Sequence, residues 1–181
     1  MRSCDRGALL GMVLFATAWC GAPNRDYTGL KMGNRWTFVD GSYAFIDQVD
    51  STAEGWRYRR VGQQKCPYCK ESNPVADTSW SLVRGDSVFQ AGPETDGKWM
   101  LSIVLPPKAG SRWVVDPVEH DTMTWVSKTT VGTKGGTFQN CWKVRGSDGL
   151  EVWIEKQIGL VRLSQGELNV ELESFQTGSA K

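Results

Sequence analysis

Two cysteines separated by two residues, Cys66 and Cys69, are the clearest candidates for chemistry in the sequence. A C-x-x-C pair can close into a small disulfide, supply two thiolates to a zinc ion, or cycle between thiol and disulfide. Redox activity requires a helix that begins at the first cysteine, because the helix N-terminus lowers the thiolate pKa. Asn73-Pro74 would stop such a helix after a single turn. We therefore expect a structural disulfide between Cys66 and Cys69, with zinc binding and redox activity as alternatives.

The zinc alternative needs two more ligands than the cysteine pair supplies. Cys141 and His120, the only histidine in the chain, would complete a Cys₃His set with Cys66 and Cys69. Nothing in the sequence places Cys141 or His120 near the pair. Cys141 also fits a half-buried strand residue, and His120 lies between carboxylates in a loop that contains a proline, which is typical of solvated surface. We therefore assign no metal and no cofactor, and zinc stays an alternative.

Other patterns that would indicate an enzyme are absent from the sequence. There is no G-x-S-x-G elbow for a nucleophilic serine and no glycine-rich loop that opens a helix to hold phosphate. The many carboxylates could form an acid and base pair, but the sequence places no two of them side by side. We therefore favour a non-catalytic protein over an enzyme.

Tryptophan is the most unusual part of the composition, with nine residues in the chain. Tryptophans that face inward build a core, whereas those that face outward offer flat platforms for sugars or apolar ligands. We expect core positions for most of them. Trp153 is the exception, because strand alternation places it on the face opposite Val152 and Ile154. Trp153 is therefore the candidate ligand-binding residue.

Turn sequences recur along the chain that must position these residues. Asp40-Gly41, Arg84-Gly85-Asp86 and Ser147-Asp148-Gly149 each separate two runs of alternating apolar and polar residues, which indicates three β-hairpins. A turn signal recurs about every ten residues, and no stretch shows a helical period. The sequence predicts an all-β fold whose mostly antiparallel sheet forms a barrel, half-barrel or sandwich.

The first residues indicate export. Two arginines precede an apolar run from Ala8 to Ala18, which is too short to span a bilayer and is typical of a signal peptide over residues 1–19. Cys20 resembles the cysteine of a bacterial lipobox, so we expect lipidation there and a tether over residues 20–29. The alternative is cleavage after Ala18 and a simple secreted protein.

Residues 30–176 are expected to form a single β-domain, followed by a tail over residues 177–181. Residues 33–40 and 110–116 both contain a G-x-x-W strand start that ends in Asp, with Trp36 and Trp113 in equivalent places. This weak repeat suggests two related halves, residues 30–105 and 106–176.

The charge balance limits the partners. The chain has 21 Lys and Arg against 20 Asp and Glu, and removal of the leader leaves the mature protein without net charge. A neutral protein lacks the field that concentrates nucleic acid, so we expect no nucleic-acid partner. The expected contacts are a membrane, through the N-terminal lipid, and an unknown protein or apolar ligand.

A segment from Thr130 to Leu163 resembles a family of exported bacterial β-domains of uncharacterised function. The pattern is V-x-x-G-x-F-x-N-C-x-x-V followed by E-x-W-x-x-x-x-x-G-L-V, matched here by Val131, Gly136, Phe138, Asn140, Cys141, Val144, Glu151, Trp153, Gly159, Leu160 and Val161. The resemblance implies a lipoprotein or secreted protein of the bacterial cell envelope, lipid-anchored at the outer membrane or periplasmic face or else free in the periplasm. Cys-Pro-Tyr-Cys also resembles the glutaredoxin motif, without the strand and helix that surround it there.

Overall fold

The computed structural model describes residues 27–64 and 75–178, which form one antiparallel sheet of twelve strands. Six strands make up what we call the first meander: β1 (Arg35–Phe38), β2 (Tyr43–Thr52), β3 (Gly55–Gln64), β4 (Val75–Arg84), β5 (Ser87–Ala91) and β6 (Met100–Val104). A short 3₁₀ helix, η2 (Pro93–Thr95), lies between β5 and β6. The second meander consists of β7 (Arg112–Asp116), β8 (Asp121–Thr133), β9 (Gly136–Gly146), β10 (Glu151–Glu155), β11 (Gly159–Gln165) and β12 (Leu168–Gln176).

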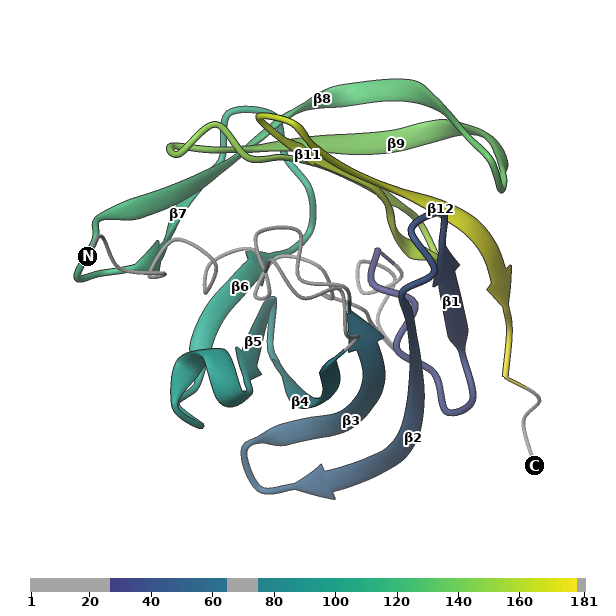
Figure 1. The fold of residues 1–181 in the computed structure, drawn as a ribbon. Coiled ribbons are helices and arrows are strands. Elements are labelled where there is room, and N and C mark those ends of the chain that lie inside the picture. The colour runs from purple at the N-terminus through teal and green to yellow at the C-terminus, as the bar shows by residue number, and fades with distance from the viewer. Residues whose placement is uncertain (1–26, 65–74, 179–181) are drawn as a thin grey trace, which may run out of the picture.

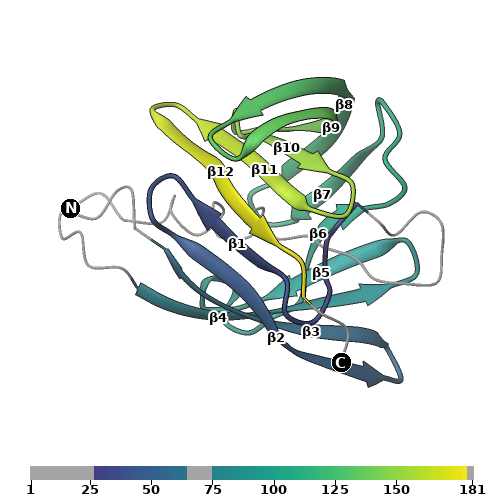
Figure 2. The same ribbon diagram turned by 90° about the vertical axis from the view of Figure 1, so that its right-hand side faces the viewer.

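The two meanders join through their first and last strands. β1 pairs with β12 in antiparallel register, with Arg35 opposite Gln176, so the order across the sheet is β6-β5-β4-β3-β2-β1-β12-β11-β10-β9-β8-β7. Figure 1 shows the meanders as two curved layers that face each other, and Figure 2 shows β1 and β12 side by side. The sheet is therefore nearly closed into a barrel, which confirms the predicted all-β antiparallel fold.

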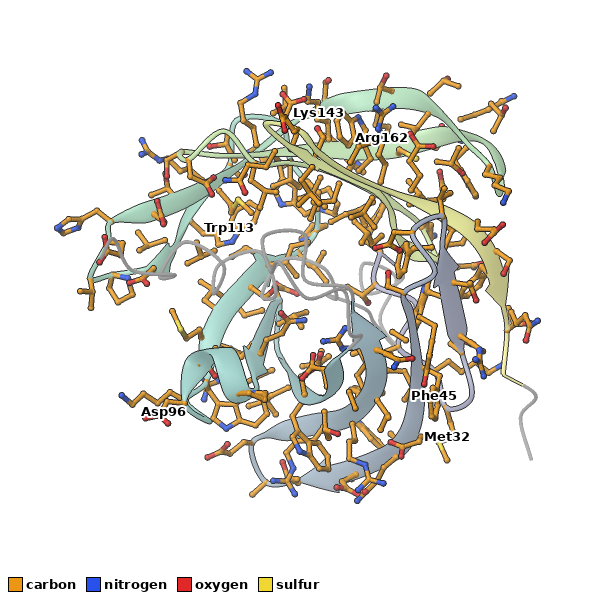
Figure 3. The ribbon with its side chains drawn as sticks, in the orientation of Figure 1. Met32, Phe45, Asp96, Trp113, Lys143 and Arg162 are labelled. Carbon is orange, nitrogen blue, oxygen red and sulfur yellow. The ribbon has the colours of Figure 1, made fainter. Side chains whose placement is uncertain are left out.

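The gap in the barrel lies between β6 and β7, which share no backbone ladder in the part of the chain that the structure describes. Indole groups bridge it. Trp113 Nε1 donates to the Ser102 carbonyl at 3.0 Å, and Trp125 Nε1 donates to the Val104 carbonyl at 2.8 Å. Trp113 lies between the two meanders in Figure 3. Because unpaired edge carbonyls invite pairing with other chains, these two bonds protect the edge of β6.

The hairpins form where the sequence predicts them, because their turn residues accept positive φ angles. Gly41, Gly85 and Gly149 have φ angles of 84°, 58° and 86°, a region that residues with a Cβ rarely occupy. Asp40 strengthens the first turn, since its Oδ1 accepts hydrogen bonds from the Ser42 backbone N–H at 2.9 Å and from the Ser42 hydroxyl.

The interior differs between the two meanders. The second meander lines it with apolar residues such as Met123, Trp125 and Leu163, all almost completely buried. The first meander adds a buried polar group: Arg60, whose Nη2 lies 3.0 Å from Asp77 Oδ2 and whose Nε donates to Ser79 Oγ at 2.9 Å. Because Arg60 is paired and hydrogen-bonded, its charge can remain inside.

The buried tryptophans are Trp36, Trp113 and Trp125, as expected for core positions. Trp36 Nε1 donates to the Ile158 carbonyl at 2.6 Å and thereby connects the first meander to the second. The expectation of a core position is wrong for Trp56 and Trp99, which are 37% and 39% exposed, and for Trp80, which is half-buried on the outer face. The division into two meanders falls between β6 and β7, and the relation of the halves by duplication stays a prediction.

Candidate binding site

Three residues of the sequence predictions lie outside the described residues. Cys20, Cys66 and Cys69 all belong to the stretches 1–26 and 65–74, so lipidation and the disulfide stay predictions. Within residues 27–64 and 75–178, no helix has the length and apolar character needed to span a membrane.

Cys141 is buried and chemically quiet. Its Sγ lies 3.6 Å from Glu155 Oε2 and 3.8 Å from the Phe138 carbonyl. Burial, assisted by the nearby Glu155 charge, raises the pKa of the Cys141 thiol to about 12. Only a thiolate attacks electrophiles or binds zinc strongly, so Cys141 has the properties of a core residue.

His120 is far from Cys141. It is an exposed turn residue with a φ angle of 58°, directly before β8, whereas Cys141 pairs with Thr129 near the other end of that strand. At about 3.3 Å per residue, the two lie roughly 30 Å apart, so one zinc ion cannot bind both. Among the described residues, no group of three or more His, Cys, Asp or Glu side chains could hold a metal.

Trp153 faces outward, on the face opposite Val152 and Ile154, as the alternation predicts. Its ring is flanked by Lys143 of β9 and Arg162 of β11, with Nζ and Cζ at 5.0 and 5.3 Å from the ring centroid. We call these three residues the Trp153 platform. Figure 3 shows Lys143 and Arg162 on the outside of the second meander.

Both cations of the Trp153 platform have polar partners. Lys143 Nζ lies 2.7 Å from Glu151 Oε1, and Arg162 Nε donates to Asn169 Oδ1 at 3.1 Å, with Glu171 Oε1 at a looser 3.7 Å. The hydrogen bond from Lys143 lowers the pKa of Glu151, and a second one from Arg145 acts in the same direction. The Lys143 ammonium and Arg162 Nε beside the Trp153 ring therefore already have partners.

A cleft of about 440 Å³ opens on the outer face of the first meander. We call it the outer cleft. Its floor consists of outward side chains of β3 and β4, and its wall is the segment that contains η2 and connects β5 to β6. The lining residues are Arg57, Thr78, Trp80, Ala91, Gly92, Pro93, Asp96, Gly97 and Trp99.

Trp80 and Arg57, on the floor of the outer cleft, belong to a second aromatic platform. Trp80 is half-buried, and the guanidinium groups of Arg57 and Arg59 lie 5.5 and 6.0 Å from its ring centroid. We call these three residues the Trp80 platform. Arg59 is held by two 2.9 Å hydrogen bonds to Asp47, which raise the pKa of Arg59. Trp80 is thus fixed between cations, as Trp153 is.

Arg57 differs from Arg59 in having spare donors. Its only ion pair with a described residue is a loose contact, with Nη2 3.7 Å from Asp50 Oδ2, and its side chain is 43% exposed. Its Nε is shielded from solvent and has no hydrogen-bond partner among the described residues. A guanidinium carries five N–H donors, so Arg57 can donate to a ligand in the outer cleft.

The rim of the outer cleft is held in shape by its own hydrogen bonds. Thr95 Oγ1 accepts from the Gly92 N–H at 3.0 Å, and Gly97 N–H donates to the Gly92 carbonyl at 3.0 Å. Asp96 adopts a left-handed conformation with a φ angle of 53°, and its exposed side chain lies on the outside of the molecule in Figure 3. A rigid rim lowers the entropy cost of binding a ligand.

The outer cleft could not be predicted from the sequence, because the alternation of residues around Trp80 is misleading. Trp80 stands between Ser79 and Ser81, which suggests that the tryptophan is inside and the serines are outside. The structure reverses this order: Ser79 and Ser81 are buried, and Trp80 is on the outer face. One signal in the sequence could have indicated the cleft: β3 and β4 are polar strands, with Arg57 and Arg59 on β3 and Asp77 on β4.

This fold and site define a β-sheet protein with a nearly closed barrel and an outer aromatic cleft. No family model matches the sequence, and no curated protein matches it. Solved structures do match the fold.

One similar structure is a protein of Bacteroides fragilis assigned as exported, with a YmcC-like fold. It has a TM-score of 0.55 at 14% sequence identity, and the alignment covers 91% of this chain and 99% of that chain. Another is a protein of Parabacteroides distasonis assigned as a lipoprotein, with a TM-score of 0.50 at 14% identity, covering 81% of this chain and 96% of that one. At this level of identity, the likeness establishes a shared fold.

Proposed function

We propose that the protein is an exported, lipid-anchored module of the bacterial cell envelope that binds a ligand or partner without catalysis. The outer cleft is the observation on which this proposal rests, because it combines two tryptophans, one arginine with spare donors and a rigid rim. Binding sites typically combine aromatic walls with a few placed polar groups.

Three findings about the predicted chemistry support binding over catalysis. The Cys141 thiol is buried with a raised pKa, His120 is an isolated exposed residue, and the two are far apart. Catalysis requires a nucleophile or base within hydrogen-bonding distance of its partner groups. The alternative proposal, a thiol-redox or zinc-dependent protein, rests on Cys66 and Cys69 alone.

The proposed occupant is a polar ligand with flat faces, in place of the apolar ligand predicted from the sequence. The buried tryptophans fill the core, where Trp125 and Trp36 are 0% and 1% exposed. The outer cleft carries Arg57 and Asp96, whose charged groups would lose hydration beneath a purely apolar molecule. A ligand that can form hydrogen bonds avoids this cost.

Anchoring and export are tested by fractionation. We expect the wild-type protein in the membrane fraction and a Cys20→Ala variant in the soluble fraction. Mass spectrometry of the mature N-terminus supplies the control, since a lipoprotein begins at the modified Cys20. A mature chain that begins at Trp19, or a Cys20→Ala protein that stays in the membrane, would contradict anchoring through Cys20.

Ligand binding by the outer cleft is tested with a fluorescent probe, 1-anilinonaphthalene-8-sulfonate, which offers an aromatic face to Trp99 and a sulfonate to Arg57. We expect saturable binding that weakens at least tenfold in Trp99→Ala. Trp56→Ala is the matched control, because Trp56 is exposed to a similar degree and does not line the cleft. Equal binding by both variants would show that the outer cleft is not the site.

A further inference from the structure

We propose that the outer cleft binds an oligosaccharide, with Trp80 and Trp99 as its aromatic contacts and Arg57 and Asp96 as its hydrogen-bonding groups. This inference rests on the proposed function, because it names the ligand class of the same site. It goes further because it assigns a chemical class to the ligand and a role to each of the four residues.

The aromatic residues suit a sugar ring. A pyranose presents C–H groups on its faces, and these carry partial positive charge that is attracted to the electron-rich face of an indole. Trp99 is 39% exposed and can present ring area to a ligand. Trp80 is fixed by its cation neighbours and needs no rearrangement before binding. Together they provide aromatic contacts on the floor and at the rim of one cleft.

The polar residues suit hydroxyl groups. Arg57 offers several N–H donors, Asp96 offers carboxylate oxygens that only accept, and Thr78 offers a hydroxyl that does both. Sugar hydroxyls donate and accept, so they can satisfy all three residues at once. The two formal charges in the lining cancel, which favours a neutral ligand over a strongly charged one.

A peptide is less well matched, because the site offers it little backbone pairing. Peptides often bind sheets by adding a strand to an exposed edge. β4 is an inner strand, paired with β3 on one side and β5 on the other. From Trp80 to Val83, β4 has a neighbouring strand on each side, so a ligand over Trp80 meets side chains.

A chain of several sugars fits better than a single one. The rim residues Thr78, Pro93 and Asp96 are exposed, so the outer cleft is open to solvent along its edge. An open cleft lets a polymer continue past the site at both ends. A closed cavity would accept only a small molecule.

The test measures binding of three hexasaccharides to the purified processed protein by titration calorimetry. They are built from β-1,4-linked glucose, β-1,4-linked N-acetylglucosamine and α-1,4-linked glucose. We expect at least one to bind, with affinity lowered about tenfold in Trp99→Ala. Trp56→Ala should bind as the wild type does.

The Asp96→Asn variant should change hexasaccharide binding and probe binding in different directions. Asparagine tolerates the left-handed backbone at this position, so the rim should keep its shape. Loss of the carboxylate should weaken hexasaccharide binding several-fold, because hydrogen bonds to a charged acceptor are about twice as strong. The same change should leave binding of the anionic probe equal or stronger, because it removes a repulsive charge.

The outcomes distinguish the two proposals. If the fluorescent probe binds in a Trp99-dependent manner and no hexasaccharide binds, the oligosaccharide inference is overturned and ligand binding by the outer cleft stands. If neither binds, both fail. Hexasaccharide binding that Trp99→Ala leaves unchanged, in a variant whose circular dichroism matches the wild type, would also overturn the assignment of this site.

Discussion

Trp80 and Trp153 hold the same place in the two meanders, but their surroundings differ. Each is on the fourth strand of its meander, faces outward and has two cations near its ring, both from β3 for Trp80 and one each from β9 and β11 for Trp153. In the first meander, the connection after the fifth strand contains η2 and closes over Trp80. In the second, β11 ends at Gln165 and β12 begins at Leu168, which leaves room only for a tight turn.

The charges around the two platforms differ as well. Lys143 forms a 2.7 Å ion pair with Glu151, and Arg162 donates a 3.1 Å hydrogen bond to Asn169, whereas Arg57 has only a 3.7 Å contact with Asp50. The Trp80 platform also has a wall beside it and an arginine without a close ion pair. Under the proposed function, these two features are what make it a binding surface, whereas the Trp153 platform lacks them.

The largest effect is expected when the wall is removed. Replacement of residues 92–99 by Asn-Gly would give the first meander the kind of tight turn that joins β11 to β12. Binding of the fluorescent probe and of any hexasaccharide should fall more than tenfold, because Asp96 and Trp99 are lost together. Calorimetry measures the affinity, and circular dichroism checks the fold. Undiminished binding would mean that the platform alone is sufficient.

A smaller effect separates the two platforms directly. Trp80→Ala and Trp153→Ala each remove a half-buried indole and should each lower the free energy of unfolding by about 2 kcal/mol. Hexasaccharide affinity should drop about tenfold in Trp80→Ala and change less than twofold in Trp153→Ala. Denaturant unfolding and calorimetry on the same samples give both values. The opposite order of affinities would move the site to Trp153, the residue that strand alternation singles out.

The smallest effect concerns the charges of the Trp153 platform. The hydrogen bond from Lys143 lowers the pKa of Glu151 below its ordinary value of 4.5, so the folded state favours the ionised carboxylate. The stabilisation is complete above that value and is lost as the pH falls through the lower, folded-state pKa. For an exposed pair, it should amount to about 0.5 kcal/mol or less.

Denaturant unfolding between pH 6 and about 3 measures this contribution. The free energy of unfolding should decline less steeply for Glu151→Gln than for the wild type. Asp50→Asn is the matched control, because its carboxylate lies 3.7 Å from the arginine of the other platform. An identical pH profile for Glu151→Gln and the wild type would show that the Lys143 pair contributes nothing to stability.

The hairpins could be predicted from the sequence because their signals are local. Asp40-Gly41 and Asp148-Gly149 specify both the turn and the register of the strands next to it. Long-range pairing has no such signal. Arg35 meets Gln176 across almost the whole chain, and nothing near either residue indicates the other.

The site was harder to predict because it depends on which face of each strand is outside. For Trp153, apolar neighbours reveal the inner face, and the prediction that it faces outward is correct. For Trp80, the buried pair of Arg60 and Asp77 makes the inner face polar and inverts the usual pattern. The outer cleft also needs Trp99 from a separate connection, which only the folded sheet brings to Trp80.

The gap between β6 and β7 makes the molecule a natural candidate for circular permutation. Gly178 N–H donates to Asn34 Oδ1 at 2.8 Å, so the last described residue lies beside the segment that leads into β1. A linker from residue 178 to residue 27 and new termini within residues 107–110 would move the covalent connection between the meanders. The connection between β6 and β7 would be cut, and a new one would join the end of β12 to the start of β1. Two indole hydrogen bonds, from Trp113 and Trp125, would then remain to keep the new ends together.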